Sequence, residues 1–143
     1  MDIEVRLAEK RDLEIIHGIL EEIQHCNLNQ RSLRLTEALD SNFSTYLVAV
    51  SAGQVIGFLN VWHLPDLVDG SYLGIVLDMY VSAEFRNRGV GKMLANSALE
   101  VGKKFPVNKY YGWVDPANKP AISLLRKFGF VTESLMLEKR VTG

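Results

Sequence analysis

The amino-acid sequence predicts one α/β domain of the mixed α+β kind over residues 1–143, and three observations support this prediction. A chain of 143 residues with 48% hydrophobic content is long enough to bury one core of ordinary size. Apolar residues recur at strand spacing in some segments and at helical spacing in others, and the two kinds of segment are interspersed. No internal repeat or low-complexity linker divides the sequence.

The charge balance and the cysteine content narrow the functional classes. There are 16 Lys and Arg residues against 17 Asp and Glu residues, and this balance argues against a nucleic-acid binder or an anionic-membrane binder. The single cysteine, Cys26, excludes an intrachain disulfide framework and a Cys-rich zinc cluster, so we expect no metal. That count fits a cytoplasmic setting, and the acidic residues 1–4 do not resemble a signal peptide.

The first third of the chain predicts one strand and two helices. Residues 3–7 alternate between apolar and polar, which is typical of a half-buried strand. After Asp12, apolar residues at 13, 16, 19, 20 and 23 share one helical face and predict an amphipathic helix. A second, short helix is expected at residues 33–39, where its boundaries are poorly marked.

The middle of the chain predicts a hairpin and a third strand. Residues 46–50 and 55–62 are β-rich runs, joined by a tight turn in which Gly53 can take a positive φ. Residues 65–71 are expected to form a polar loop. Residues 74–81 then predict a strand that is buried on both faces, with one charged residue inside it.

The last third predicts two helices, one strand between them and a closing hairpin. A helix is expected from Val90 to Gly102, and a strand at residues 109–114. Pro120 favours the start of another helix, which Gly129 ends. The final hairpin is expected at residues 130–131 and 135–137.

Two glycines and three basic residues surround the start of the helix that follows the third strand. The first amides of a helix lack internal acceptors and lie at the positive end of its dipole. Gly89 and Gly91 allow a ligand to approach that backbone, while Arg86, Arg88 and Lys92 add positive charge. This pattern predicts a phosphate or diphosphate site. A glycine turn for tight packing, with solvated basic side chains, is the alternative, and the local sequence leaves both open.

Two separate blocks of the sequence resemble the GNAT acetyltransferase superfamily. Residues 81–91 contain Arg-Asn-Arg-Gly-Val-Gly, which is similar to the family core Arg/Gln-x-x-Gly-x-Gly/Ala. Residues 118–130 resemble the family's Asn-x-x-Ala…Gly-Phe block, and residues 6–12 look like a family start. The resemblance covers essentially the whole chain. It implies a mixed, mostly antiparallel sheet with splayed central strands and flanking helices.

The resemblance implies acetyl-CoA as the cosubstrate and assigns residues to hold it. The pantetheine arm would pair with the exposed strand edge at Met79, Tyr80 and Val81 by strand addition. Asn118 matches an asparagine that helps to hold the cofactor, although it equally suits a helix cap. The diphosphate would lie on backbone amides of the helix start, namely Asn87, Arg88, Gly89, Val90, Gly91 and Lys92.

Two residues of the same strand are the catalytic candidates. The resemblance implies that Met79 N–H stabilises negative charge on the thioester oxygen. Asp78 is the single charge in that strand, and we expect it to attract a cationic amine or relay its proton. A satisfied structural carboxylate, which would have a hydrogen-bonding partner, is the alternative for Asp78.

The sequence departs from the family pattern at two positions. Leu125 stands where many members have a tyrosine that protonates the leaving thiolate. Trp113 stands where some members that acetylate protein N-termini have a glutamate. The general acid and the general base are therefore not at their usual positions, and slow turnover is the milder consequence.

We therefore expect an N-acetyltransferase that transfers acetyl from acetyl-CoA to a primary amine of a small molecule or protein. The alternative within the same fold is a CoA-binding module or sensor with little turnover. A plain phosphate-binding α/β module is the third possibility. A homodimer is possible, but no residue of the sequence demonstrates it.

Overall fold

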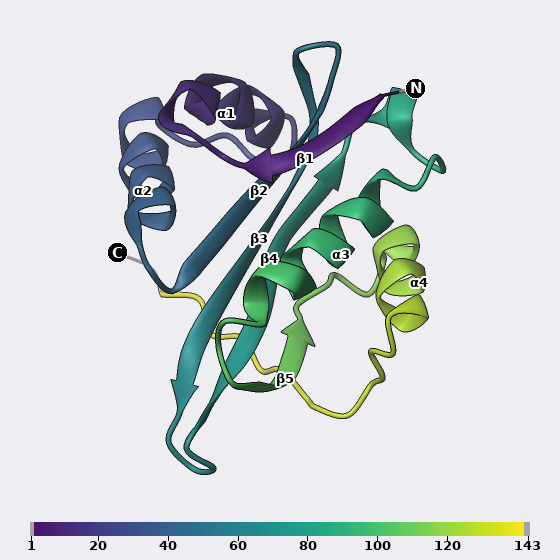
Figure 1. The fold of residues 1–143 in the computed structure, drawn as a ribbon. Coiled ribbons are helices and arrows are strands. Elements are labelled where there is room, and N and C mark those ends of the chain that lie inside the picture. The colour runs from purple at the N-terminus through teal and green to yellow at the C-terminus, as the bar shows by residue number, and fades with distance from the viewer. Residues whose placement is uncertain (1, 142–143) are drawn as a thin grey trace.

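A five-stranded sheet organises the computed structural model, which describes residues 2–141 (Figure 1). Two single-turn 3-10 helices, at Lys10–Asp12 and Ala83–Phe85, precede α1 and α3. The strands and α-helices follow the chain as β1 (Ile3–Leu7), α1 (Leu13–Glu21), α2 (Leu28–Asp40), β2 (Ser44–Ser51), β3 (Gln54–Asp66), β4 (Ser71–Val81), α3 (Val90–Gly102), β5 (Val107–Gly112) and α4 (Lys119–Lys127).

The strand order is β1-β2-β3-β4-β5, with antiparallel pairing between the first four strands. β5 follows a helical crossover and pairs parallel to β4. The mixed, mostly antiparallel sheet expected from the sequence is therefore confirmed. The expected hairpin at β2–β3 is also present, and its turn places Gly53 at a φ of 77°.

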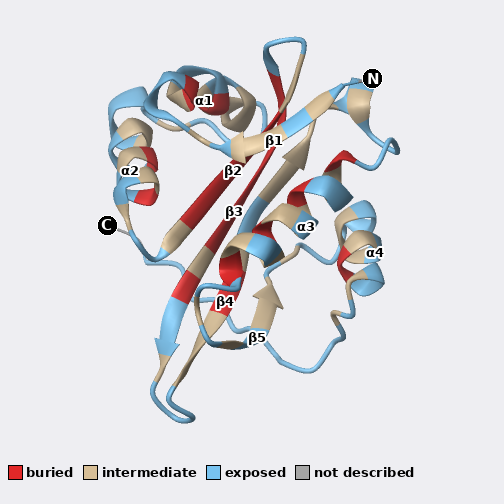
Figure 2. Cartoon of the chain, in the orientation of Figure 1, coloured by how far each residue is buried: buried red, intermediate tan, exposed pale blue. Residues whose placement is uncertain are grey.

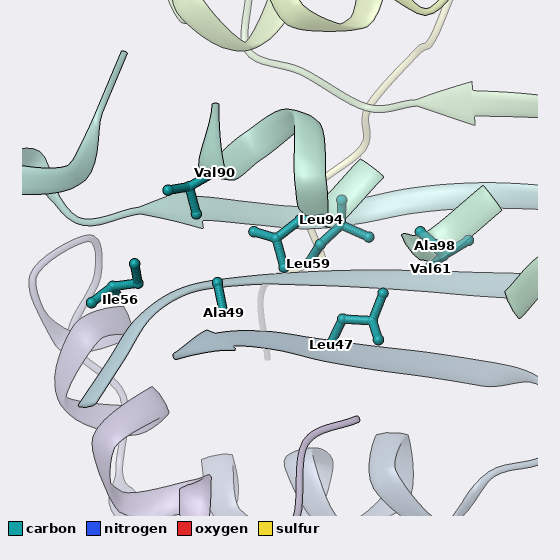
Figure 3. Close-up of a cluster of buried hydrophobic side chains, with 8 residues drawn as sticks. All are labelled: Leu47, Ala49, Ile56, Leu59, Val61, Val90, Leu94 and Ala98. Atoms are coloured by element: carbon teal, nitrogen blue, oxygen red, sulfur yellow. The ribbon is translucent and has the colours of Figure 1, made fainter. Parts of the chain in front are cut away.

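Two hydrophobic clusters lie on opposite faces of this sheet. On one face α1 and α2 pack on β2 and β3, through buried residues such as Ile16, Leu35 and Phe58. On the other face α3 packs through Val90, Leu94 and Ala98 onto the same two strands, as Figure 3 shows. β2 and β3 are consequently the most buried strands (Figure 2). A rigid centre of this kind positions the more exposed β4 and the start of α3.

Two expectations about the secondary structure are wrong, one about a hairpin and one about the length of a helix. The expected final hairpin is absent from the described chain, because residues 130–131 and 135–137 have no ladder partner. Their apolar side chains are exposed, with Leu135 at 83%, so β-rich composition alone did not produce a strand. The second helix is longer than expected, because Asn27 caps it and accepts hydrogen bonds from Asn29 N and Gln30 N.

The β3–β4 ribbon also extends further than the sequence indicates. Three residues of the expected loop at residues 65–71 are paired, since Pro65 lies opposite Tyr72 and Asp66 opposite Ser71, and residues 67–70 form the turn. β2 ends its pairing with β3 at Trp62, so Pro65 lies where β3 has become an edge strand. Proline is tolerated there because one side of the strand needs no N–H donor.

His63 is the main polar residue of the core that lacks hydrogen bonds. Its side chain is fully buried, and neither ring nitrogen has a hydrogen-bonding partner within residues 2–141. The ring stacks on Phe105 at 4.5 Å between centroids and meets Tyr110 edge-on at 6.2 Å. Burial, with a smaller contribution from the charge of Lys104, lowers the pKa of His63. The folded protein therefore holds this imidazole neutral.

We predict that His63 makes the fold sensitive to mild acid. The unfolded chain binds a proton at His63 near pH 6.5, whereas the folded chain binds it only at lower pH. The free energy of unfolding should stay level above about pH 6.5 and fall below it, by at most about 1.4 kcal/mol per pH unit from this residue. Denaturant unfolding at several pH values measures this slope.

The control for this prediction is His63→Phe, which keeps a flat ring against Phe105 and removes the titrating group. Between pH 5 and pH 6.5 the free energy of unfolding of this variant should vary less with pH, because unfolding no longer takes up about one proton at residue 63. Equal slopes for the variant and the parent chain would show that His63 does not cause the acid sensitivity.

Candidate active site

The site begins where β4 loses its second neighbour. Pairing with β5 ends at Val76, opposite Gly112, and Trp113 N donates a last hydrogen bond to Val76 O at 3.3 Å. The register of β4 against β3 shifts at the same place, so that Leu77 is an extra, bulged residue. Beyond this bulge, residues 78–81 pair with β3 alone. The two central strands therefore splay apart and leave a notch in the sheet, which confirms the expected splay of the central strands.

The free edge of β4 presents main-chain groups. Ser82 N donates to Ile56 O of β3 at 2.8 Å, so the backbone groups of the preceding residue, Val81, point the other way. By the same alternation, Met79 also faces the free edge, whereas Tyr80 faces β3. The side chain of Arg86 forms a hydrogen bond with one of these main-chain groups, since its Nε donates to Val81 O at 2.9 Å. An extended ligand that uses this carbonyl must displace Arg86.

The loop before α3 has the geometry of an anion cradle. Asn87 and Gly89 have positive φ values of 62° and 82°, which turn the chain sharply around Arg88. Gly89 is the N-cap of α3 and supplies no side-chain hydrogen bond, so the first amides of this helix face solvent without a cap. Val90 is buried and anchors the helix start in the core. The cradle is therefore exposed but fixed in position.

Basic side chains gather around this cradle. Arg86 lies over the ring of Tyr80 at 5.8 Å, and Arg88 lies over Phe85 at 5.7 Å. Lys92 is exposed in the first turn of α3. These three cations raise the positive potential at a helix end that is already positive.

Gly91 has the tight-packing role that the sequence left open as the alternative to a phosphate site. A Cβ at residue 91 would lie 2.8 Å from Cδ2 of Leu124, so the glycine lets α4 approach the first turn of α3. The two interpretations of the glycine pair therefore apply to different residues. Gly91 provides close packing, whereas a methyl group added at Gly89 would have nothing within 4 Å, so Gly89 leaves the approach to the backbone open.

Asp78 lies on the face of the sheet that α1 and α2 cover. Tyr46, Asn60 and Asp78 lie opposite one another across β2, β3 and β4, and Tyr46 packs into the cluster beneath these helices. Asp78 is exposed, contrary to the expected buried strand, because the bulge and the missing β5 partner open the surface around it. Burial, with a smaller contribution from Asp78, raises the pKa of Tyr46.

The carboxyl group of Asp78 is available for chemistry. Within residues 2–141 it has no hydrogen-bonding or ion-pair partner, so the structural alternative, a satisfied carboxylate, does not hold. The surrounding protein still removes part of its hydration and raises its pKa. Asp78 therefore has an exposed carboxyl group whose pKa is raised above that of an ordinary aspartate.

Asn118 and Leu125 lie on α4, beside the end of β5. Asn118 is the N-cap of α4, and its side chain accepts a hydrogen bond from Ala121 N at 3.3 Å. Leu125 is buried, and a Cβ on Gly112 would lie 2.7 Å from its Cδ1. Leu125 therefore fills the space beside the splay point with an apolar group, and the half-exposed Trp113 follows directly on the chain.

Two contacts of this site, one made by Tyr46 and one by Arg86, were not predicted from the sequence. Tyr46 is brought to Asp78 by the register of three strands, and nothing local to residue 46 indicates that register. Arg86 was predicted only as a positive charge, whereas its hydrogen bond to Val81 O depends on the single-turn helix Ala83–Phe85, which brings residue 86 back beside the end of β4. A cross-strand alignment of the β-rich runs could have suggested the first of these contacts.

The comparisons with known proteins agree on one family. The profile of the acetyltransferase (GNAT) family matches residues 13–130. A putative [ribosomal protein bS18]-alanine N-acetyltransferase of Bacillus subtilis is 27% identical over 93 residues. An N-alpha-acetyltransferase of Sulfolobus acidocaldarius is 32% identical over 104 residues. These matches cover 65% and 66% of this chain but only 58% and 60% of the two relatives.

Solved structures share the fold at low sequence identity. The aminoglycoside N-acetyltransferase AAC(6')-Iy in complex with CoA superposes with a TM-score of 0.86 at 21% identity, covering 98% of this chain and 95% of that one. A ribosomal-protein-alanine N-acetyltransferase from Brucella melitensis gives a TM-score of 0.81 at 18% identity, covering 98% of this chain and 100% of that one.

In the described part of this chain, no helix has the length and apolarity needed to cross a membrane.

We predict that Gly89→Ala destabilises the fold through the backbone alone. Its φ of 82° disfavours any L side chain, while no atom would contact the new methyl group. The free energy of unfolding should fall by about 1 kcal/mol. Gly18→Ala is the matched control, because it also meets open space but lies inside α1, and it should stabilise by about 0.5–1 kcal/mol. Denaturant unfolding measures both, and an unchanged Gly89→Ala protein would refute the left-handed turn.

Proposed function

The chain belongs to the GNAT acetyltransferase family, and on that premise we propose that it transfers an acetyl group from acetyl-CoA to a primary amine of a protein or small molecule. The observation that carries this proposal is the placement of the open β4 edge directly before the anion cradle. An extended, amide-bearing arm needs a strand edge, and a diphosphate at its end needs uncapped helix amides. The chain offers both within residues 77–92.

The proposed binding roles follow from the main-chain geometry. Met79 and Val81 would pair with the pantetheine arm, with Tyr80 between them as the residue that holds β4 to β3. Asn118 would contribute from the start of α4, in addition to its capping role. The diphosphate would lie on the loop and first turn of α3, at Asn87, Arg88, Gly89, Val90, Gly91 and Lys92.

The reaction needs a deprotonated amine and a stabilised oxyanion. A lysine-like amine has a pKa near about 10.4, so it arrives protonated and attracted to a carboxylate. Asp78 would orient this ammonium group and take one proton from it, directly or through water, which frees the nitrogen lone pair to attack the carbonyl carbon. The N–H of Met79 would donate to the developing oxyanion. The C–S bond then breaks, CoA leaves as a thiolate, and the nitrogen loses its second proton to water or to that thiolate.

Leu125 favours one alternative. Its buried side chain cannot donate a proton to the thiolate. It fills the space beside Gly112, where the hydroxyl group of a tyrosine would supply that proton. A thiol with a pKa near about 8.5 leaves acceptably without an acid, so slow turnover remains compatible with this site. A CoA-binding sensor with little turnover is the second candidate.

The first experiment separates binding from turnover. Titration calorimetry with acetyl-CoA, with ATP as the control nucleotide, should show binding of acetyl-CoA that depends on the thioester arm and not on adenine alone. A turnover screen should then include peptides with free N-termini, aminoglycosides and polyamines, since the relatives named above act on proteins and aminoglycosides. Failure to bind acetyl-CoA would refute both candidates, and binding without turnover would leave the sensor.

We predict that Asp78→Asn lowers the turnover number by about a hundredfold or more, with acetyl-CoA affinity unchanged. Because the fold disfavours the charged carboxyl group, the amide should leave the thermal stability equal or higher. Steady-state kinetics and thermal unfolding measure the two effects. Asp40→Asn, which changes an exposed carboxylate at the end of α2, is the control and should change neither. Unchanged turnover in Asp78→Asn would remove Asp78 from the mechanism.

The same carboxyl group predicts a pH profile. If Asp78 acts as a base, turnover falls as the pH falls through its raised pKa, so the acidic limb lies above the ordinary value of 3.8. The Asp78→Asn protein should lack this limb. A limb that persists in the variant would assign it to another group.

We predict that Lys92→Glu weakens acetyl-CoA binding by roughly three- to tenfold. A charge reversal in the first turn of α3 opposes an anion at the helix end, at an exposed position where it does not disturb packing. Calorimetry at low salt measures the change, and added salt should reduce it. Lys10→Glu, an exposed charge reversal before α1, is the control. Equal losses in both variants would indicate a general charge effect instead of a local cradle.

A further inference from the structure

The end of β5 presents aromatic side chains to one face of the sheet. Tyr110 packs in the cluster beneath α3, and by strand alternation Gly112 faces the same way. A Cβ on Gly112 would lie against Leu125 of α4, which agrees with this assignment. Tyr111 and Trp113 therefore point to the opposite face, the one that α1 and α2 cover.

Trp113 and Asp78 lie on the two sides of the notch and face the same way. Asp78 is opposite Asn60, on the face of α1 and α2. The hydrogen bond from Trp113 N to Val76 O, at 3.3 Å, holds Trp113 at the level of the bulge in β4. Its indole is 49% exposed, and the carboxyl group is exposed as well. A ligand that enters the notch from this face meets an aromatic ring on one strand and a carboxyl group on the other.

Further apolar side chains continue this face on both sides of the notch. Tyr80, two residues after Asp78, packs against the cluster beneath α1 and α2, and so does Trp62 of β3. Ile75 lies between Trp62 and Tyr111, opposite each of them on the neighbouring strands. An apolar group attached to an amine at Asp78 would therefore find apolar and aromatic walls.

The charges on this face suit a single ammonium group. Among strands β2 to β5, which the structure describes in full, the acidic residues are Asp78 and Asp66, and Asp66 lies at the far end of the β3–β4 hairpin. The guanidinium group of Arg86 lies over the ring of Tyr80 at 5.8 Å, so a cation borders the site toward the cradle. Lys109, exposed on β5, points to the same face by alternation. A polycation would meet these two cations and one carboxylate.

We propose that the acceptor is a primary amine on an apolar stem, and that Trp113 is the residue that selects it. This inference rests on the proposed function, because it concerns the acceptor of the same acetyl transfer. The ammonium group pairs with Asp78 and lies against the indole face, which attracts a cation electrostatically. The stem extends over the apolar wall. A small alkyl or aryl monoamine and a peptide with an apolar first residue share this chemistry.

The first test compares acceptors on the unaltered chain. The kcat/KM for phenethylamine should exceed that for spermidine and for the aminoglycoside sisomicin by roughly tenfold or more. Equal or higher values for the two polycations would overturn the proposal. Two tripeptides, one beginning with phenylalanine and one with aspartate, identify the source of the amine. A peptide source predicts that the first tripeptide exceeds both phenethylamine and the second tripeptide, and a small-molecule source predicts that phenethylamine exceeds both.

The second test assigns the selection to Trp113. Trp113→Ala keeps the backbone N–H that bonds to Val76, so it should raise KM for phenethylamine roughly tenfold and leave kcat within about threefold. Trp113→Phe should restore most of the affinity. For ethanolamine, which lacks an apolar stem, Trp113→Ala should change KM by less than about threefold. An equal rise in KM for both amines would indicate a structural effect and overturn the proposal.

Phe43→Ala is the matched control for this substitution. Phe43 is 42% exposed, close to the value for Trp113, but it packs on Tyr72 at the other end of β4. Its loss should leave KM for both amines unchanged.

The third test measures binding of the amine without turnover. The sequence has two tryptophans, so in a Trp62→Phe background the emission comes from Trp113 alone. Titration with phenethylamine in the presence of CoA should change this emission saturably, and Asp78→Asn in the same background should weaken binding roughly tenfold or more. Unchanged emission would overturn the proposal.

The failure of this inference is distinguishable from the failure of the proposed function. Acetyl transfer to polycations, or transfer that ignores Trp113, overturns the inference and leaves the acetyltransferase in place. If no amine is turned over, the emission titration alone decides about the amine site. Absence of acetyl-CoA binding in calorimetry refutes the proposed function itself.

Discussion

The end of the parallel pairing between β4 and β5 is the constraint on which the candidate site depends. Backbone groups inside a sheet must find partners, and β4 satisfies only one of its edges beyond Val76. The bulge at Leu77 turns the strand at that point, and Leu125 fills the space beside Gly112 where β5 leaves. Unpaired polar groups at an open edge are costly unless water or a ligand satisfies them. The surrounding core, which is densest on β2 and β3, holds this edge open.

Much of this fold was predictable because its helices and strands carry regular apolar spacing. The helix at Val90–Gly102 and the strands around Gly53 follow from local pattern and from glycine at a left-handed turn. Local pattern failed at the C-terminal segment, where β-rich residues 130–137 have no partner in the described chain. It also failed at Pro65, because a strand that changes from central to edge along its length has no signature in sequence.

Asp78 illustrates how a useful prediction can rest on a wrong premise. The apolar neighbours of Asp78 indicated a strand buried on both faces and a carboxyl group with a partner. The structure places the same residue at an exposed position, and no partner for it lies within residues 2–141, because the neighbouring strand has departed. Burial of a strand depends on what covers it, and residues 107–112 cannot be aligned with β4 from sequence alone. The raised pKa survives this correction, since nearby protein still removes part of the hydration.

The free edge of β4 is made of main chain, and this has an evolutionary consequence. Substituting a side chain at residues 79–81 leaves the N–H and C=O groups in place, so drift along this strand need not erase the groups that a ligand would contact. Lineages can accordingly diversify what surrounds the notch while inheriting the notch itself. Superpositions with TM-scores of 0.81 and 0.86 at 18% and 21% identity show that the fold as a whole also tolerates extensive change of side chains.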